Sequence, residues 1–185
     1  FLQPPESAPT SKEPIVKIRD LNSIYIEAGD TFSVEYQKGL YVDIFPFIDY
    51  PTVPRPWAKK LCKGISVSYS ILHAQHYYSL RSFAEFFYFG MKYALFKGIW
   101  AMLCLVRPKG TYLSNILINN GYGIMHRKDS VFPLSTITFE GKDFPAPGNV
   151  DAYLKDLYKN YMDIPPKEKQ IVHACYIHPE LKPLP

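Results

Sequence analysis

Gly39-Leu-Tyr-Val-Asp-Ile-Phe-Pro-Phe-Ile-Asp-Tyr-Pro51 is the stretch from which the fold prediction starts. Its residues 42–48 are a nearly continuous apolar run, interrupted by the carboxylate of Asp43, and the stretch is bounded by a glycine and a proline. Such a run is typical of a strand that is buried on both faces of a sheet. A buried carboxylate is costly unless a cation or hydrogen bonds compensate its charge. The residues alone leave two interpretations open: a structural position, at a turn or paired with a Lys or Arg, and a metal-binding or catalytic position.

Two shorter segments with alternating polarity precede this run. Residues 15–20 and 23–27 alternate apolar and polar side chains, which predicts two half-buried strands of a hairpin. Lys17 and Arg19 are two residues apart and therefore project from the same face of the first strand. Arg19 can bind a phosphate through two hydrogen bonds, and Lys17 can add a point charge. The alternative is that both belong to a solvated strand face.

The middle of the chain shows helical patterns. Residues 57–79 follow three prolines and place apolar side chains at helical spacing. Residues 108–121 predict a further helix that ends at an Asn-Gly pair. Between them, residues 83–106 are strongly apolar and aromatic.

The segment 83–106 is long enough to cross a membrane. Glu85, Lys92 and Lys97 interrupt it, and each charge at mid-membrane costs about 2.5–3.5 kcal/mol on insertion scales. These charges favour a buried or partly buried helix. Two alternatives stay open: a membrane span, and a helix that lies on the inner membrane face with Lys92, Lys97 and Arg107 at the lipid headgroups.

The composition describes a folded chain with moderate charge. A length of 185 residues, 47% of them hydrophobic, suits one domain with a substantial core. The net charge of +4 suits anionic substrates or a membrane surface, but Lys and Arg are spread along the chain, so no nucleic-acid interface is predicted. Cys62, Cys104 and Cys175 are far apart, which predicts reduced thiols and a cytoplasmic location, at the inner membrane face if the apolar segment docks there.

Three blocks of the sequence resemble the LicD family of phosphotransferases. Residues 40–51 resemble the I-D-I-F-P-L-D signature, and residues 17–27, KIRDLNSIYIE, resemble the family's K-I-R-D-x-N-T-x-[FY]-I-E motif. Residues 131–166 resemble its closing block, with Lys159 and Asn160 in place of the usual Gly and Asp. Agreement is weaker between residues 57 and 122.

The resemblance implies a reaction and a set of site residues. LicD proteins transfer phosphocholine, or a related phospho-alditol, from a CDP-linked donor such as CDP-choline to a glycan acceptor. Their metal, Mg²⁺ or Mn²⁺, is held by aspartates of an upstream Asp-rich motif and by one later aspartate, and Asp43 falls on that later position. The resemblance therefore implies a catalytic and metal-binding role for Asp43. It implies substrate binding by Arg19 and Lys17, with Arg19 contacting the donor phosphate or serving as a structural partner of the aspartates.

The Asp-rich motif itself does not occur among the 185 residues, which contain no D-x-D or D-D-D run. The resemblance therefore implies the C-terminal part of a longer enzyme, inactive by itself.

The predicted fold class is α+β, a partial nucleotidyltransferase-like mixed sheet with a helical middle region and a C-terminal hairpin plus helix. The alternative function is a non-catalytic domain that contacts a membrane or a partner through the aromatic helix 83–106. The single predicted domain, 1–185, comprises a lead-in (1–14), a sheet with the site strand (15–51), a helical region (56–120), a hairpin and helix (131–166) and a tail (167–185).

Overall fold

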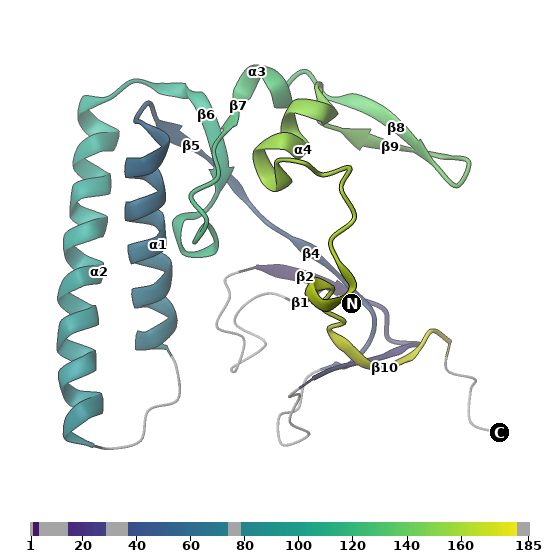
Figure 1. Cartoon of the computed structure of the whole chain (residues 1–185), viewed down its shortest axis with the longest axis horizontal. Coiled ribbons are helices and arrows are strands. Elements are labelled where there is room, and N and C mark those ends of the chain that lie inside the picture. The colour runs from purple at the N-terminus through teal and green to yellow at the C-terminus, as the bar shows by residue number, and fades with distance from the viewer. Residues whose placement is uncertain (1, 4–14, 29–36, 74–78, 181–185) are drawn as a thin grey trace. The chain divides into compact units, whose positions relative to one another are not determined.

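The computed structural model describes residues 2–3, 15–28, 37–73 and 79–180. Within the single domain predicted from the sequence, the chain divides into two compact units (Figure 1). Unit 1 comprises Phe1–Phe45 and Ile164–Pro185, and unit 2 comprises Pro46–Asp163. Most of the predicted lead-in, residues 4–14, lies outside the described residues.

The described strands of unit 1 form two small antiparallel sheets. In one sheet, β2 (Val16–Arg19) lies between β1 (Leu2–Gln3) and β4 (Tyr41–Ile44). In the other, β3 (Ile24–Glu27) pairs with β10 (Ala174–His178). Both segments predicted to be strands are strands, but the predicted hairpin between them is wrong. The tail, for which the sequence showed little pattern, contains η3 (Lys167–Lys169) and β10.

The turn after β2 explains why β3 does not fold back onto it. The backbone N–H of Asp20 donates to the Leu40 carbonyl at 2.8 Å, and the Leu40 N–H donates to Ser23 Oγ at 2.9 Å. A Cβ added to Gly39 would lie 1.7 Å from the Asp20 carbonyl oxygen, so this close approach requires glycine. The turn is therefore bonded to the segment that enters β4, and β3 finds its partner elsewhere.

The central stretch of sequence forms two strands rather than one. β4 ends at Ile44 in unit 1, and β5 (Phe47–Pro51) begins in unit 2 after Pro46, which has no N–H for a ladder bond. The prediction of burial on both faces is also wrong, because Val42 is 64% exposed. On β4 the apolar side chains are the exposed ones, while Tyr41 and Asp43 are partly covered.

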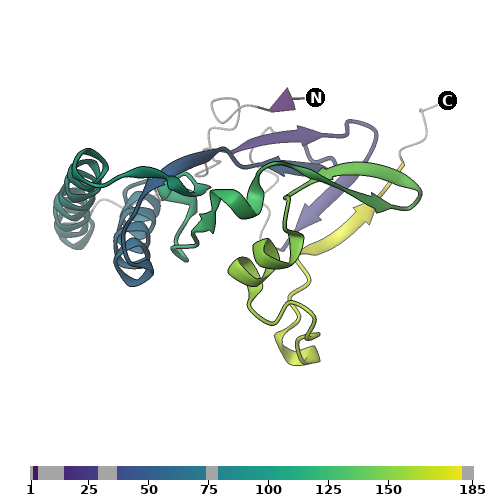
Figure 2. The same ribbon diagram turned by 90° about the horizontal axis from the view of Figure 1, so that it is seen from above.

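Two antiparallel helices, α1 (Arg55–Leu72) and α2 (Leu80–Val106), pack side by side in unit 2 (Figures 1 and 2). Pro56 occupies the first turn of α1, where its missing N–H costs nothing. Ser79 caps α2 by accepting a hydrogen bond from the Ser82 N–H at 3.1 Å. Residues 74–78, the end of the first predicted helix, lie outside the described residues.

The prediction that the apolar segment 83–106 is buried or partly buried is confirmed as partial burial, because one face packs against the core through Tyr93, Phe96 and Leu103 while the rest is exposed. Of the residues described in α2, Trp100 is the one that is buried. It packs edge-on against Tyr50, with 4.8 Å between the ring centroids, and joins a core shared by α1, α2 and β5. The other buried members of this core are Val53, Ala58, Leu61, Cys62, Ile65 and Met125.

The predicted helix over residues 108–121 is wrong. The predicted helical region 56–120 is therefore too long, because α2 ends at Val106. The segment forms β6 (Lys109–Asn115), which pairs antiparallel with β5 and with β7 (His126–Arg127), followed by the short helix η2 (Leu117–Asn119). Gly110 has a φ of 97°, which an α-helix cannot contain. Thr111 and Tyr112 favour a strand once a neighbouring strand is available.

The C-terminal part of unit 2 agrees with the sequence prediction. β8 (Ser135–Phe139) and β9 (Lys142–Ala146) form a hairpin whose turn places Gly141 at a φ of 74°. After α3 (Lys128–Val131) and this hairpin, α4 (Val150–Tyr158) begins at Asn149, whose side chain accepts a hydrogen bond from the Ala152 N–H at 2.9 Å. The α+β class is confirmed. The described strand pairings are all antiparallel, in small separate sheets, so the predicted mixed sheet is not formed.

Candidate functional site

The three residues predicted for the site lie on two adjacent strands of unit 1. The register of β2 and β4 places Lys17 opposite Asp43 and Arg19 opposite Tyr41. Residues two apart on a strand share a face, so these four side chains belong to one face of the sheet. We call them the β2–β4 cluster.

Lys17 and Asp43 form an ion pair. Lys17 Nζ donates to Asp43 Oδ1 at 2.6 Å. The Lys17 and Asp43 side chains are 17% and 28% exposed, so the pair is shielded but still reachable from solvent. The predicted pairing of Asp43 with a Lys or Arg is therefore confirmed. A charged ligand could replace one partner of the ion pair, because solvent reaches both side chains.

Arg19 is buried, and its guanidinium contacts two other residues of unit 1, Gly39 and Tyr41. Its Nη1 donates to the Gly39 carbonyl at 3.2 Å, and its Cζ lies 4.7 Å from the centroid of the Tyr41 ring. Of the two roles left open for Arg19, phosphate contact and structural support, this geometry favours support. Arg19 ties the turn before β4 to the cluster.

Tyr41 is a member of the cluster that the sequence analysis missed. Its hydroxyl donates to the Glu27 carboxylate, and its ring lies under Lys17 Nζ at 4.0 Å. Burial and the neighbouring Glu27 carboxylate raise the pKa of the Tyr41 hydroxyl well above its usual range, so it stays protonated. A signal existed in the sequence, because Tyr41 is two residues before Asp43 and must share its face.

The described residues do not form a divalent-metal site by themselves. No group of three His, Cys, Asp or Glu side chains close enough to hold an ion occurs among residues 15–28, 37–73 and 79–180. At Asp43 the structure offers a carboxylate whose oxygen is engaged by an ammonium group. Mg²⁺ needs several oxygen ligands, and a cation beside Lys17 is repelled. The role of Asp43 as a metal ligand stays a prediction.

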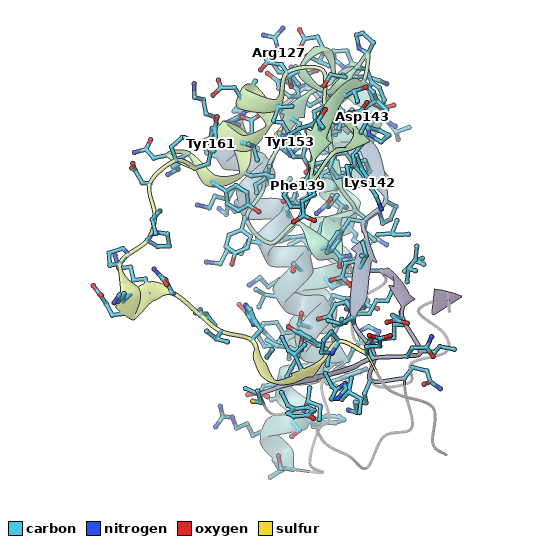
Figure 3. The ribbon with its side chains drawn as sticks, turned by 90° about the vertical axis from the view of Figure 1, so that its right-hand side faces the viewer. Arg127, Phe139, Lys142, Asp143, Tyr153 and Tyr161 are labelled. Atoms are coloured by element: carbon cyan, nitrogen blue, oxygen red, sulfur yellow. The ribbon has the colours of Figure 1, made fainter. Side chains whose placement is uncertain are left out.

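A second ionisable cluster lies in unit 2 around His126. The buried imidazole stacks on the Tyr153 ring at 4.2 Å, and its Nδ1 lies 3.4 Å from Asp156 Oδ2, without a well-aligned hydrogen bond. Figure 3 shows Tyr153 on α4 and Arg127 on the strand that carries His126. Arg55 also bonds to Asp156. Arg127 pairs with Asp129, and both side chains are exposed.

His126 is expected to make unit 2 sensitive to acid. Burial lowers the pKa of His126, with the Arg55 charge adding to the effect and Asp156 opposing it. The unfolded chain therefore binds a proton, below a pH of about 6.5, that the folded chain does not bind. The free energy of unfolding should fall with decreasing pH in that range, by at most about 1.4 kcal/mol per pH unit. Urea unfolding, followed by tryptophan fluorescence between about pH 5 and pH 7.5, measures this slope.

The matched variants for this test are His126→Gln and His73→Gln. Gln at position 126 cannot titrate, so the variant should show a weaker dependence of stability on pH. His73 is exposed at the end of α1, so its replacement controls for the loss of a histidine outside the buried cluster. Equal pH dependence in both variants would show that another group is responsible.

No family model, curated protein or solved structure matches this chain. The resemblance to the LicD family therefore rests on the three blocks of sequence. The positions of Asp43, Lys17 and Arg19 in the β2–β4 cluster are compatible with it, and their roles stay predictions.

Proposed function

We propose that this chain is part of a LicD-type phosphotransferase that transfers phosphocholine or a phospho-alditol from a CDP-linked donor to a hydroxyl of a glycan. The observation that supports the proposal is the partly exposed ion pair of Lys17 and Asp43, contributed by two strands whose sequences both resemble the family's motifs. A cytoplasmic location belongs to the same proposal.

The two members of the ion pair suit two different tasks in this reaction. The donor's diphosphate would compete with Asp43 for the Lys17 ammonium group. The carboxylate thus released would accept the proton of the attacking hydroxyl. The hydroxyl oxygen bonds to the phosphorus that carries the transferred group, the bond from that phosphorus to the bridging oxygen breaks, and CMP leaves. Arg19 acts as a positioning residue that holds Gly39 and Tyr41.

Mg²⁺ or Mn²⁺ belongs to the proposal only for the complete enzyme. The ion would offset negative charge on the donor's diphosphate. Because the described residues do not form its site, the steps above are assigned to Lys17 and Asp43 alone.

The 185-residue chain by itself is expected to release no CMP from CDP-choline and to bind Mg²⁺ only weakly. One lysine-paired carboxylate seldom retains this ion without further ligands. Isothermal titration calorimetry measures the affinity, and chromatography measures CMP. Turnover or tight Mg²⁺ binding by the chain alone would contradict this expectation.

The function itself is tested with the protein translated from the complete open reading frame. It should release CMP from CDP-choline or CDP-ribitol when a glycan acceptor is present. Failure with every CDP-linked donor would remove the proposed function, whatever the behaviour of the isolated chain.

A further inference from the structure

α2 presents two different faces. Its inner face contacts α1 and the core of unit 2 through Tyr93, Phe96 and Trp100. The rest of the helix is as apolar as this face but is not covered by described residues. Among the described helices, α2 is long and apolar enough to cross a membrane, and 6% of its most apolar window is buried. A helix that is apolar all round is normally covered on all sides.

The uncovered face is a continuous line of apolar residues, which we call the outer stripe. Its large members are 55–91% exposed: Leu80, Phe83, Phe87, Met91 and Leu105. Their spacings follow the helical repeat, so they lie on one face. Between Met91 and Leu105, the exposed residues Ala94, Gly98 and Ala101 continue the same face.

The charged residues of α2 lie beside the outer stripe and not on it. Successive helical side chains are rotated by about 100°. This rotation places Lys97 next to one edge of the stripe. Arg81, Glu85 and Lys92 lie further round the helix on the other side, where Arg81 pairs with Glu85. Arg107 and Lys109 follow directly after the C-terminal end of the helix. The surface around the stripe therefore carries more cations than carboxylates.

The helical pair also holds the positive charge of the chain. Residues 55–109 contain nine Lys or Arg and one acidic residue, Glu85, whereas the whole chain has 21 Lys or Arg and 17 Asp or Glu. The remainder of the chain therefore has more acidic than basic residues. Cations that flank an apolar helical face match a bilayer with anionic headgroups.

We propose that the outer stripe of α2 docks onto an anionic lipid bilayer, with the helix lying in the plane of the interface. In this orientation Lys92 and Lys97 reach the headgroups from the two sides of the helix while the stripe contacts the acyl chains. A span would place Lys92 near the middle of the hydrocarbon layer. Pairing of two copies through the stripe would bring their flanking cations together, and these like charges would repel each other. On an anionic bilayer the same cations face negative headgroups, so this repulsion does not arise. The docking does not rest on the proposed enzymatic function.

Vesicle co-sedimentation of the chain tests the docking. Vesicles of phosphatidylcholine mixed with phosphatidylglycerol should bind the chain more tightly than vesicles of phosphatidylcholine alone, and added salt should weaken the difference. The double variant F87E/M91E should weaken binding at least about tenfold. A second variant, F83S/L105S, should also weaken binding. Far-UV circular dichroism checks that both retain the helical content of the wild type.

Two matched controls come from the β8–β9 hairpin, where Phe139 and Lys142 are exposed (Figure 3). F139E replaces an exposed aromatic residue off the helix and should leave binding unchanged. K97Q should weaken binding to the anionic vesicles more than K142Q does, because Lys97 borders the outer stripe.

Four outcomes would overturn the docking. The first is no binding to either kind of vesicle, and the second is unchanged binding by both stripe variants. The third is a loss of binding by F139E as large as the loss caused by the stripe variants. The fourth is a salt-independent association that only detergent reverses, which indicates a membrane span. A dimer in solution that F87E/M91E converts to monomers, without vesicle binding, would instead assign the stripe to a second copy.

Discussion

Replacing Asp43 with Asn in the complete protein is expected to lower the rate of group transfer by about 10²–10⁴-fold. Asn keeps the size of the side chain but cannot accept the proton of the acceptor hydroxyl. The loss of the ion pair to Lys17 should cost less than about 1 kcal/mol of stability, because both side chains are partly exposed. The steady-state rate of CMP release, measured with donor and acceptor both saturating, gives the effect.

Asp129→Asn is the matched control. Asp129 pairs with Arg127, but it lies on α3 in unit 2, outside the three blocks of sequence that resemble the family. Its replacement also removes an ion pair between exposed side chains and should leave the rate within about twofold of wild type. A similar loss in both variants, or full activity of Asp43→Asn, would show that the Asp43 carboxylate has no chemical role.

Replacing Trp100 with Ala is expected to destabilise unit 2 by about 3–5 kcal/mol. Trp100 is the buried anchor of α2, and its ring packs edge-on against Tyr50. Removal of the indole leaves a cavity between α1, α2 and β5, which the neighbouring helices can only partly close. Urea unfolding followed by far-UV circular dichroism measures the change.

Phe139→Ala provides the comparison, because this ring is exposed on the β8–β9 hairpin. It should change the free energy of unfolding by less than about 0.5 kcal/mol. If Trp100→Ala cost as little as Phe139→Ala, α2 would not be held by its inner face. The division of α2 into a packed inner face and an exposed outer stripe would then be wrong.

Local signals in the sequence were sufficient for the C-terminal hairpin and helix. Gly141 allows the tight turn of the β8–β9 hairpin, and Asn149 caps α4. Partners distant in sequence could not be predicted in this way. β3 pairs with β10, and β6 becomes a strand because β5 supplies its neighbour. No periodicity within either segment specifies such a partner.

The candidate site was partly predictable. The alternation of residues 15–20 predicted that Lys17 and Arg19 share a face, and the cost of burying a carboxylate predicted a partner for Asp43. The register that makes Lys17 this partner depends on the pairing of β2 with β4, which the sequence analysis did not predict. The support of Tyr41 by Glu27 depends likewise on tertiary structure.

The extent to which α2 is exposed was also beyond the sequence analysis. Its charges favoured a buried or partly buried helix, because each charge at mid-membrane is costly, and left a helix on the membrane face as an alternative. In the structure, one face carries Trp100 while the cations lie to the sides of a stripe that remains uncovered. The distribution of charge around a helix, and not only the number of charges, decides which surface it can contact.

Analysis of the reaction products tests the account most directly. The complete protein should be incubated with CDP-choline or CDP-ribitol and a glycan acceptor, and the acceptor examined by phosphorus NMR and mass spectrometry. The account predicts free CMP and a new phosphodiester that joins the choline or ribitol group to the glycan, both absent with Asp43→Asn. An acceptor that carries the cytidine nucleotide, or product formation that is unchanged in Asp43→Asn, would contradict it.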